Sequence, residues 1–464
     1  MEYVNLWIGP LLAAVLAFGP AACDSGGGGT GAASPDDDDD GGDADTDDDV
    51  DDTGTGGLGV TIASPTDGSE LEEGDSLVFE ASVEGGEPPF EYSWSFDGAA
   101  PASAALSPGA IELVEPGSYE ATLTVTDSSE QTAEAQVGFD VLSAEGDMQY
   151  WFGNLHSHSG YSDGEGDPAE VLAWARDEAG LDFYAMTDHS EQLFGSEWEE
   201  IGVQVALADE AGEFVALRGF EWSHPINGHV CIYDTDDYTA AYFAIWINFI
   251  YDWIDERDAF AQFNHPGREI GVFNDLDLET YVVDNFFAIE TGNKGDGNND
   301  GEFLPYYTQA LDNGWRVAPV SNQDNHSMSV NSHRTVYVGP TLSSDGLRAA
   351  MGARRLYSTD DPDIEIAFKL GDAWMGEVVP APEDSARFTV KVTDDEPIVA
   401  VELIGNGDTV IAEQLPGPDT SELLWKPEVP VTSGDYVFVK VTSTDELDGD
   451  GPEQIAVTAP IWFE

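Results

Sequence analysis

The sequence has little positive charge. Lysine and arginine total 15 residues against 92 aspartates and glutamates, which gives a formal net charge of −77. The field around such a chain repels nucleic acids and anionic membrane surfaces, so we expect no nucleic-acid partner. Because acidic residues occur in every segment, their abundance favours solubility in an extracellular or salty setting over adaptation to a Ca²⁺-rich environment.

Cysteine is almost absent. The two cysteines, Cys23 and Cys231, lie in such different sequence contexts that we expect no disulfide between them. Cys231 belongs to the apolar run "HVCIYD", where a cysteine usually serves as a small buried hydrophobic residue. The sequence therefore predicts no reactive thiol at this position.

Long apolar runs are also scarce. Residues 5–22 form one and Cys23 follows directly, an arrangement that resembles a bacterial lipoprotein signal with Cys23 as the lipidated first residue of the mature chain. A transmembrane anchor is the alternative, but the run is near the lower length limit for spanning and contains Pro10 and Pro20. Residues 24–57 are rich in Gly and Asp and predict an extended acidic tether. We expect an extracytoplasmic protein, in the periplasm or on the outer surface, that contacts the cell envelope membrane through its lipid anchor only.

Three folded regions are predicted beyond the tether. Residues 58–143 and 363–464 show short alternating strands separated by turn residues, and each region predicts a β-sandwich. Residues 148–362 alternate apolar strands with helical patterns such as "DPAEVLAWARDEAG", which predicts an α/β domain. The first region resembles the PKD family of immunoglobulin-like modules through Trp94, Asp97, Gly98, Tyr119 and Asp127. The expected fold class is therefore multidomain, an α/β domain flanked by two β-sandwiches.

Histidines and acids gather at the ends of the predicted strands of residues 148–362. Six of the eight histidines of the chain lie there with carboxylates beside them: His156, His158, His189, Glu221, His229, His265, Glu290, Asp324 and His326. In a closed β/α barrel the carboxyl ends of the strands meet on one face, so these residues are predicted to share one pocket. Imidazole and carboxylate without thiolate suit Zn²⁺, Mn²⁺ or Fe²⁺.

Five segments of this region resemble a known family. In chain order, "NLHSHSGYSDG", "TDHSE", "FEW" with "GHV", "NHPG" and "QDNH" are similar to the PHP family, named for polymerase and histidinol phosphatase domains. The resemblance covers residues 148–362 and implies a distorted seven-stranded β/α barrel that binds two to three divalent metal ions. More loosely, "GLRAAMGARRLYSTDD" and the ending "VTAPIWFE" resemble the carbaryl-hydrolase-like branch, which carries a C-terminal β domain.

The same resemblance implies a set of nine metal ligands. One metal would be held by His156, His158 and Asp324. Glu221 would bridge this metal to a second one, held by His229 and His265. A third metal would be held by Asp163, His189 and His326.

The function implied by this ligand set is metal-dependent hydrolysis. A hydroxide bridging two metals would attack a small extracytoplasmic ester, most simply a phosphate ester, so that no Ser or Cys nucleophile is needed. Arg268 and Arg334 are candidates to neutralise phosphate charge, and His224 and His333 are candidates to protonate the leaving group or orient the substrate. Each of these four also fits an ordinary structural or surface role.

Two other functions stay open from the sequence. The scarcity of basic residues is compatible with a metallohydrolase of carboxylic or carbamate esters, whose site needs fewer phosphate-binding cations. A non-catalytic surface adhesion or metal-binding lipoprotein is the alternative of another class, in which the two β domains act and the central domain is inert.

Overall fold

The computed structural model of the chain describes residues 57–113, 115–244, 246–269, 272–293, 303–444 and 453–464. The predicted signal segment, Cys23 and residues 24–56 of the predicted tether lie outside these ranges. Within the described ranges, every helix is too short or too polar to cross a membrane.

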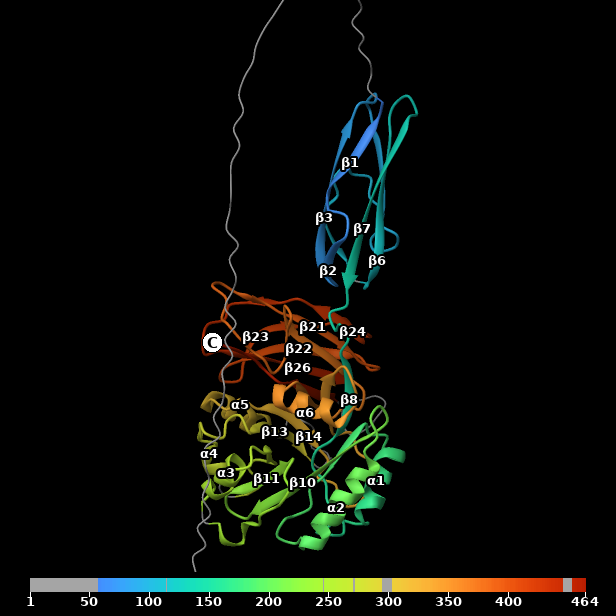
Figure 1. Cartoon of the computed structure of the whole chain (residues 1–464). Helices are drawn as coiled ribbons and strands as arrows, with labels where there is room; N and C mark the ends of the chain where they lie inside the picture. Colours follow the sequence, from blue (N-terminus) through green and yellow to red (C-terminus); the bar gives the residue numbers. More distant parts are fainter. Residues whose placement is uncertain (1–56, 114, 245, 270–271, 294–302, 445–452) are drawn as a thin grey trace, which may run out of the picture. The chain divides into compact units, whose positions relative to one another are not determined.

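Residues 59–142 form two facing β-sheets (Figure 1). One sheet has the order β1 (Gly59–Ser64), β3 (Asp75–Glu84), β5 (Gly109–Leu113), and the other has the order β2 (Ser69–Glu72), β7 (Thr132–Leu142), β6 (Gly117–Thr126), β4 (Glu91–Ser95). Phe79, Trp94 and Phe139 are buried between them, and the Trp94 ring lies 5.6 Å from the Phe79 ring in an edge-on arrangement. Trp94 Nε1 donates to the Ala105 carbonyl at 3.1 Å. Because side chains alternate between the two faces of a strand, each sheet turns one face inward, and aromatic side chains pack between the inward faces.

A sheet of 15 strands is built from residues between 149 and 463. Its main path is β14-β13-β12-β11-β10-β9-β8-β15-β16-β27-β26-β22-β23, with β28 paired to β26 and β19 paired to β28. The first nine strands in chain order are β8 (Gln149–Asn154), β9 (Phe183–Met186), β10 (Val215–His224), β11 (Gly228–Tyr233), β12 (Phe260–Asn264), β13 (Phe286–Asn293), β14 (Ala318–Asn322), β15 (Arg334–Gly339) and β16 (Leu356–Thr359).

The helices of residues 148–362 are few and short (Figure 1). They are α1 (Pro168–Asp177), α2 (Gly195–Ala208), the 3₁₀ turn η1 (Ala241–Phe243), α3 (Asn248–Asp255), α4 (Val272–Asp275), α5 (Leu304–Asn313) and α6 (Ser344–Ala353). Helix α1 begins where the sequence indicates, because the Asp167 side chain accepts from Glu170 N and Pro168 occupies the first turn. Val171 and Leu172 of this helix are buried.

The sheet of residues 148–362 is curled and mixed. Pairing is parallel for β8/β9, β9/β10, β12/β13 and β13/β14 but antiparallel for β10/β11 and β11/β12. Residues 225–227 are the whole connection between β10 and β11, too short for the crossover that a parallel pair requires. The curl brings the segment after β14 back to the segment after β8, where His158 N donates to Asn325 O at 2.9 Å. The regular strand–helix alternation expected from the sequence is therefore interrupted.

The C-terminal β region shares this sheet. Strand β16 pairs with β27 (Glu453–Thr458), and the sheet continues through β26 (Tyr436–Thr444), β22 (Ile398–Gly405) and β23 (Thr409–Gln414). Strand β28 (Ile461–Phe463) pairs with β26, and β19 (Val378–Val379) pairs with β28. A second sheet contains β18 (Ala373–Trp374), β17 (Glu365–Leu370), β21 (Thr389–Thr393) and β24 (Glu422–Trp425), and β20 (Ala386–Arg387) pairs with β25 (Glu428–Val429). Phe368 and Phe388 are fully buried and belong to one apolar core with Val336 of β15.

Cys231 of β11 provides a direct test of this packing. Its side chain is fully buried, and burial raises the pKa of the thiol to about 12. At pH 8 only about one molecule in 10⁴ would then carry a thiolate. We expect Cys231 in a Cys23→Ser chain to stay unmodified by a disulfide reagent at pH 8 and to react fully in denaturant. Rapid modification of the folded protein would contradict the burial of β11.

Candidate metal centre

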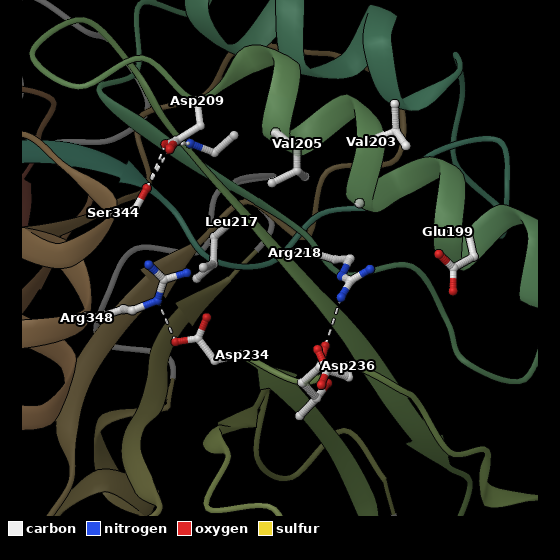
Figure 2. A pocket seen from close by; sticks show the side chains of 14 residues that line it. Glu199, Val203, Val205, Asp209, Leu217, Arg218, Asp234, Asp236, Ser344 and Arg348 are labelled. Carbon is white, nitrogen blue, oxygen red and sulfur yellow. Dashed lines mark hydrogen bonds and ion pairs between the residues drawn. The ribbon is translucent and has the colours of Figure 1, made fainter.

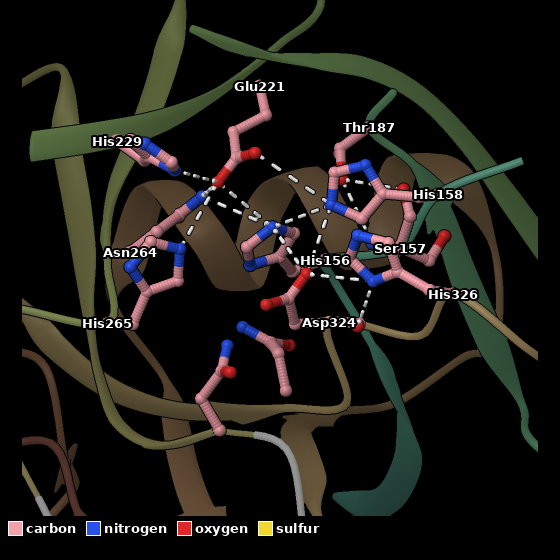
Figure 3. Close-up of polar contacts among 12 residues, drawn as sticks. His156, Ser157, His158, Thr187, Glu221, His229, Asn264, His265, Asp324 and His326 are labelled. Atoms are coloured by element: carbon pink, nitrogen blue, oxygen red, sulfur yellow. Dashed lines mark hydrogen bonds and ion pairs between the residues drawn. The ribbon is translucent and has the colours of Figure 1, made fainter. Parts of the chain in front are cut away.

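The nine residues that the sequence suggests as ligands lie together at the strand ends of the curled sheet. His156 and His158 follow β8, His189 follows β9, Glu221 lies in β10, His229 lies in β11, His265 follows β12, and Asp324 and His326 follow β14. Asp163 lies in the loop before α1. Figure 3 labels all of them except Asp163 and His189, and the labelled ligand side chains point toward one another from separate strands. The curl of the sheet is therefore what joins stretches of chain more than 150 residues apart.

Glu221 is the central residue of the cluster. Its side chain is fully buried, and its Oε1 lies 3.1 Å from His156 Nε2, 3.2 Å from His229 Nδ1 and 3.4 Å from His265 Nε2. Its other oxygen, Oε2, lies 2.6 Å from His189 Nδ1. This one carboxylate thus contacts four histidines, and its two oxygens face different members of the cluster. Such an arrangement suits a bridging ligand; Figure 3 shows Glu221 with His156, His229 and His265.

Asp324 and Asp163 occupy the two sides of the histidine pair after β8. Asp324 Oδ1 lies 3.1 Å from His158 Nε2 and 3.4 Å from His156 Nε2. Asp163 Oδ1 lies 3.1 Å from His326 Nε2 and 3.9 Å from His158 Nδ1. The Asp163 side chain is 47% exposed, whereas that of Asp324 is 5% exposed, so Asp163 belongs to the rim and Asp324 to the floor of the cluster.

The ligand atoms fall into four overlapping groups. These are His158, Asp163, His189 and His326; His156, His158 and Glu221; His156, His265 and Asp324; and Glu221, His229 and His265. Metal–ligand bonds of about 2.0–2.2 Å in a tetrahedral site place the ligand atoms roughly 3.3–3.6 Å apart, close to the separations found here. The donor set of imidazole and carboxylate therefore fits divalent transition metals such as Zn²⁺, Mn²⁺ or Fe²⁺. His156, His158 and His265 each belong to two of these groups, whereas the family resemblance assigned each of them to one metal.

Glu290 of β13 orients the innermost histidine. Its fully buried carboxylate accepts from His156 Nδ1 at 2.9 Å, from His265 N at 2.7 Å and from Asn322 Nδ2 at 3.0 Å. A hydrogen bond at Nδ1 turns Nε2 of His156 toward the cluster, as outer carboxylates do in metal sites. From the sequence, Glu290 could be placed only at the end of a predicted strand. Its hydrogen bonds could not be predicted, because they join it to three other segments of the chain.

Glu269 is a neighbour of the cluster that sequence reasoning missed. Its oxygens lie 3.7 Å from His229 Nε2 and 3.5 Å from His265 Nδ1. The sequence contained one signal for this contact, because Glu269 stands four residues after His265 in "NHPGRE". Asn264 adds a further contact, because its Nδ2 donates to Glu221 Oε1 at 2.8 Å.

The charges of the cluster shift the pKa values of its members. Burial alone would raise the pKa of Glu221, but the surrounding histidines, His229 foremost, hold it well below its usual value. Burial lowers the pKa of His265, but the nearby carboxylates of Glu221 and Glu269 outweigh this effect and raise the pKa to about 9. Without a metal, His265 therefore keeps a proton at neutral pH, and Glu221 keeps its negative charge.

Metal binding should consequently release protons. Because the pKa of metal-free His265 is about 9, most molecules carry a proton on His265 at pH 7.5, and a metal must displace it. We expect the apparent affinity for Zn²⁺ to weaken as the pH falls below 9, by up to about tenfold per pH unit for each proton displaced. Calorimetric titration at pH 7.5 in two buffers of different ionisation enthalpy measures the release. Equal heats in both buffers would contradict the prediction.

Only one of the four candidate residues for substrate chemistry lines the cluster pocket. The pocket has a volume of about 210 Å³ and is lined by Asp163, His189, Glu221, His229, His265, Arg268, Glu269, Asp324 and His326. Arg268 Nη1 lies 3.3 Å from Asp324 Oδ2, and its side chain is 31% exposed. Part of its guanidinium group is therefore open to a ligand in the pocket.

The other three candidates make their contacts with the surrounding chain. His224 Nδ1 accepts from Ile226 N and Asn227 N, and its Nε2 donates to Ala244 O at 3.0 Å, so both ring nitrogens bind backbone. His333 Nδ1 lies 2.7 Å from Ser321 Oγ. Arg334 donates to the backbone carbonyls of Asn331 and His333. These contacts hold loops in place, and the structure does not bring these side chains to the pocket lining.

A second pocket lies on the flank of α2 (Figure 2). It is larger, about 710 Å³, and includes Val203 and Val205 of α2, Leu217 and Arg218 of β10, and Arg348 of α6. Arg348 Nε pairs with Asp234 at 2.7 Å, and Arg218 Nη2 donates to Thr235 O at 2.9 Å. Both arginines are thus engaged within the wall, and the histidines and carboxylates converge in the smaller pocket instead.

Comparisons with known proteins give distant structural similarities. No family model matches the chain, and no curated protein matches it either. A two-domain protein from Bacteroides vulgatus, described as containing a predicted PHP-like metal-dependent phosphoesterase, is 16% identical with a TM-score of 0.39, covering 67% of this chain and 96% of that one. A PKD domain of a Vibrio cholerae metalloprotease is 21% identical with a TM-score of 0.15, covering 18% of this chain and 96% of that domain.

Fold and site together define a multidomain, mostly β protein with few helices, in which a curled sheet carries a cluster of metal-ligand residues. Because these similarities are remote, the residues of this cluster are the basis for assigning a chemistry.

Proposed function

We propose that this protein is a metal-dependent hydrolase of the PHP type that cleaves small phosphate esters. The observation that carries the proposal is the Glu221 carboxylate, fully buried and within 3.4 Å of three histidine nitrogens through one oxygen. A buried acid contacted on all sides by imidazoles suits the bridging ligand of a multinuclear metal site. In this proposal the curled sheet corresponds to the distorted seven-stranded β/α barrel of that family, with two to three divalent ions of Zn, Mn or Fe.

The residues of the cluster and of the pocket would have separate roles in hydrolysis. The histidines and carboxylates of the cluster would hold the divalent ions, with His156 fixed in orientation by Glu290. Ions held there would supply Lewis acidity and activate water as the nucleophile. Arg268, at the pocket wall beside Asp324, supplies positive charge toward an oxygen of the substrate phosphate. The small pocket admits the phosphate and leaves the alcohol part toward solvent.

The pocket lining also supports a second candidate function, hydrolysis of carboxylic or carbamate esters. Arg268 is the only lysine or arginine among the residues that line the described pocket. A site with a single, partly exposed cation also suits a carboxylic or carbamate ester, whose attacked group carries less negative charge. This second candidate uses the same metal cluster and differs only in what Arg268 contributes.

Location and attachment complete the proposal. We infer from residues 5–23 an extracytoplasmic lipoprotein anchored to the bacterial cell envelope through Cys23, and from the strong acidity a protein without nucleic-acid partners. The PKD-like sheets of residues 59–142 would then serve as a spacer between anchor and hydrolase.

The test pairs two substrate types with one variant. The purified protein is assayed with para-nitrophenyl phosphate and with aryl acetate and carbamate esters, with and without a chelator. We expect phosphate ester turnover that the chelator removes, and a loss of about tenfold or more in kcat/KM in Arg268→Ala for the phosphate ester alone.

Each other result identifies a different function. Chelator-sensitive turnover of the carboxylic or carbamate esters alone would favour the second candidate function. Bound metal at two or three ions per chain without turnover of any ester would favour the non-catalytic metal-binding lipoprotein. A chain that binds no metal would contradict both hydrolase proposals.

A further inference from the structure

A second group of carboxylates lies in the C-terminal β region, apart from the nine residues of the first cluster. Asp361 and Asp363 lie between β16 and β17, and Asp394 directly follows β21. One oxygen from each of the three carboxylates lies within 4.8 Å of the other two. The antiparallel register pairs Glu365 with Thr393, so the residues before β17 and after β21 meet at one end of this strand pair.

Asp361 is held rigidly in this group. It is 1% exposed, and its Oδ1 accepts from Asp363 N at 3.0 Å and from Ile364 N at 2.9 Å. Its Oδ2 accepts from the hydroxyl of Ser443, on β26 of the other sheet, at 3.2 Å. Asp361 therefore stands where the two sheets of the C-terminal region meet, with its backbone and side chain both fixed.

Asp394 carries the observation that points to a ligand. It is 6% exposed, and its Oδ1 accepts from Glu396 N at 2.8 Å. Its Oδ2 is buried and has no hydrogen-bond donor in the described part of the chain. The single hydroxyl hydrogen of Ser443 is used by Asp361. A buried carboxylate oxygen left without any partner is costly, so an atom that satisfies it is to be expected here.

In the described part of the chain, the two buried carboxylates of this group, Asp361 and Asp394, have no positively charged partner. Burial raises the pKa of Asp361 to about 7, and repulsion from Asp394 adds to the rise. Burial likewise raises the pKa of Asp394 to about 6. Two crowded carboxyls without a counter-charge destabilise one another, and a cation between them would remove that repulsion.

We propose that Asp361, Asp363 and Asp394 bind one Ca²⁺ ion that joins the connection between β16 and β17 to the loop after β21. All donors here are oxygens, which suits a hard cation, whereas the imidazole-rich first cluster suits transition metals. Three carboxylates on loops at the meeting point of two sheets give the site a structural role. This inference is independent of the hydrolase function proposed above.

The experiment uses the full chain with its histidine cluster saturated with Zn²⁺, in buffer freed of Ca²⁺. Ca²⁺ alone is added and followed by calorimetry and by Tm. We expect one Ca²⁺ per chain with a Kd of about 10⁻⁴–10⁻³ M, as in extracellular modules. At ten times the Kd, Tm should rise by roughly 2–4 °C.

Matched variants locate the site. Asp394→Asn and Asp363→Asn should lose the Ca²⁺-dependent rise in Tm. Asp395→Asn changes an exposed neighbour of the same chemistry and should keep it. Because Asp363 is exposed, its variant tests the site even if Asp394→Asn impairs folding.

The order of stabilities provides a readout that a merely structural hydrogen bond would not produce. Without Ca²⁺, Asp394→Asn should melt at or above the temperature of the unmodified chain, since the substitution removes a repelling charge. With Ca²⁺ the order should reverse. The proposal is overturned if the unmodified chain binds no Ca²⁺ at about 10 mM, ten times the weaker end of the expected range. It is equally overturned if Ca²⁺ shifts Tm alike in the unmodified chain, Asp363→Asn and Asp394→Asn.

Discussion

Replacing Glu221 with alanine is expected to abolish turnover while the flanking β regions stay folded. The Glu221 carboxylate contacts His156, His189, His229 and His265, so its loss removes the group that would bridge two of the proposed ions. Glu221→Gln keeps the size of the side chain but offers one neutral oxygen in place of two charged ones. We expect each variant to lose at least about 10³-fold in kcat/KM, the scale of charge stabilisation that a metal pair supplies.

The control for this prediction is a carboxylate outside the cluster. Glu199→Gln changes a residue of α2 at the second pocket and should leave kcat/KM and metal content unchanged. Elemental analysis should show fewer ions per chain in Glu221→Gln than in Glu199→Gln, with similar circular dichroism. Full activity in Glu221→Gln would end the case for a bridging carboxylate.

Replacing Glu290 with glutamine is expected to weaken metal binding without removing a ligand. Glu290 accepts from His156 Nδ1 and from His265 N, so the amide would lose charge and one acceptor position at the same time. Loss of such an outer partner typically lowers metal affinity or activity by about 10–100-fold. We therefore expect a weaker Kd for Zn²⁺ in Glu290→Gln, measured by competition with a chelating dye.

Added metal distinguishes this positioning role from a catalytic one. Activity of Glu290→Gln should recover as the free Zn²⁺ concentration rises, whereas that of Glu221→Gln should not. A Glu290→Gln protein whose Kd matches that of the unmodified chain would show that His156 keeps its orientation without this hydrogen bond. Glu199→Gln, at the second pocket, is a suitable control here as well.

The positions of the cluster residues were accessible from the sequence because they follow a simple local rule. His156, His189 and His265 each follow a short apolar run, and such runs predict strand ends without knowledge of the fold. The start of α1 was accessible for the same reason, since Asp167 and Pro168 act on their own neighbours. That these residues hold metal remains a prediction that the elemental analysis above tests.

Contacts between distant segments were not accessible in this way. The hydrogen bond between His156 and Glu290 joins residues 134 positions apart, and no local pattern encodes it. His224, a candidate for proton transfer by its residue type, binds backbone through both ring nitrogens instead. Its neighbours in space come from the turn after β10 and from the chain near Ala244, which sequence periodicity does not pair.

By itself the sequence determined how acidic the chain is and which residue types follow its short apolar runs, because composition and local periodicity need no partner. Only the tertiary structure decided that the sheet is curled with an antiparallel turn at β10–β11, and that β16 joins the C-terminal strands to the same sheet. It also decided which carboxylate meets which histidine. The physical reason is that register and side-chain contact depend on free energy summed over the whole packed chain.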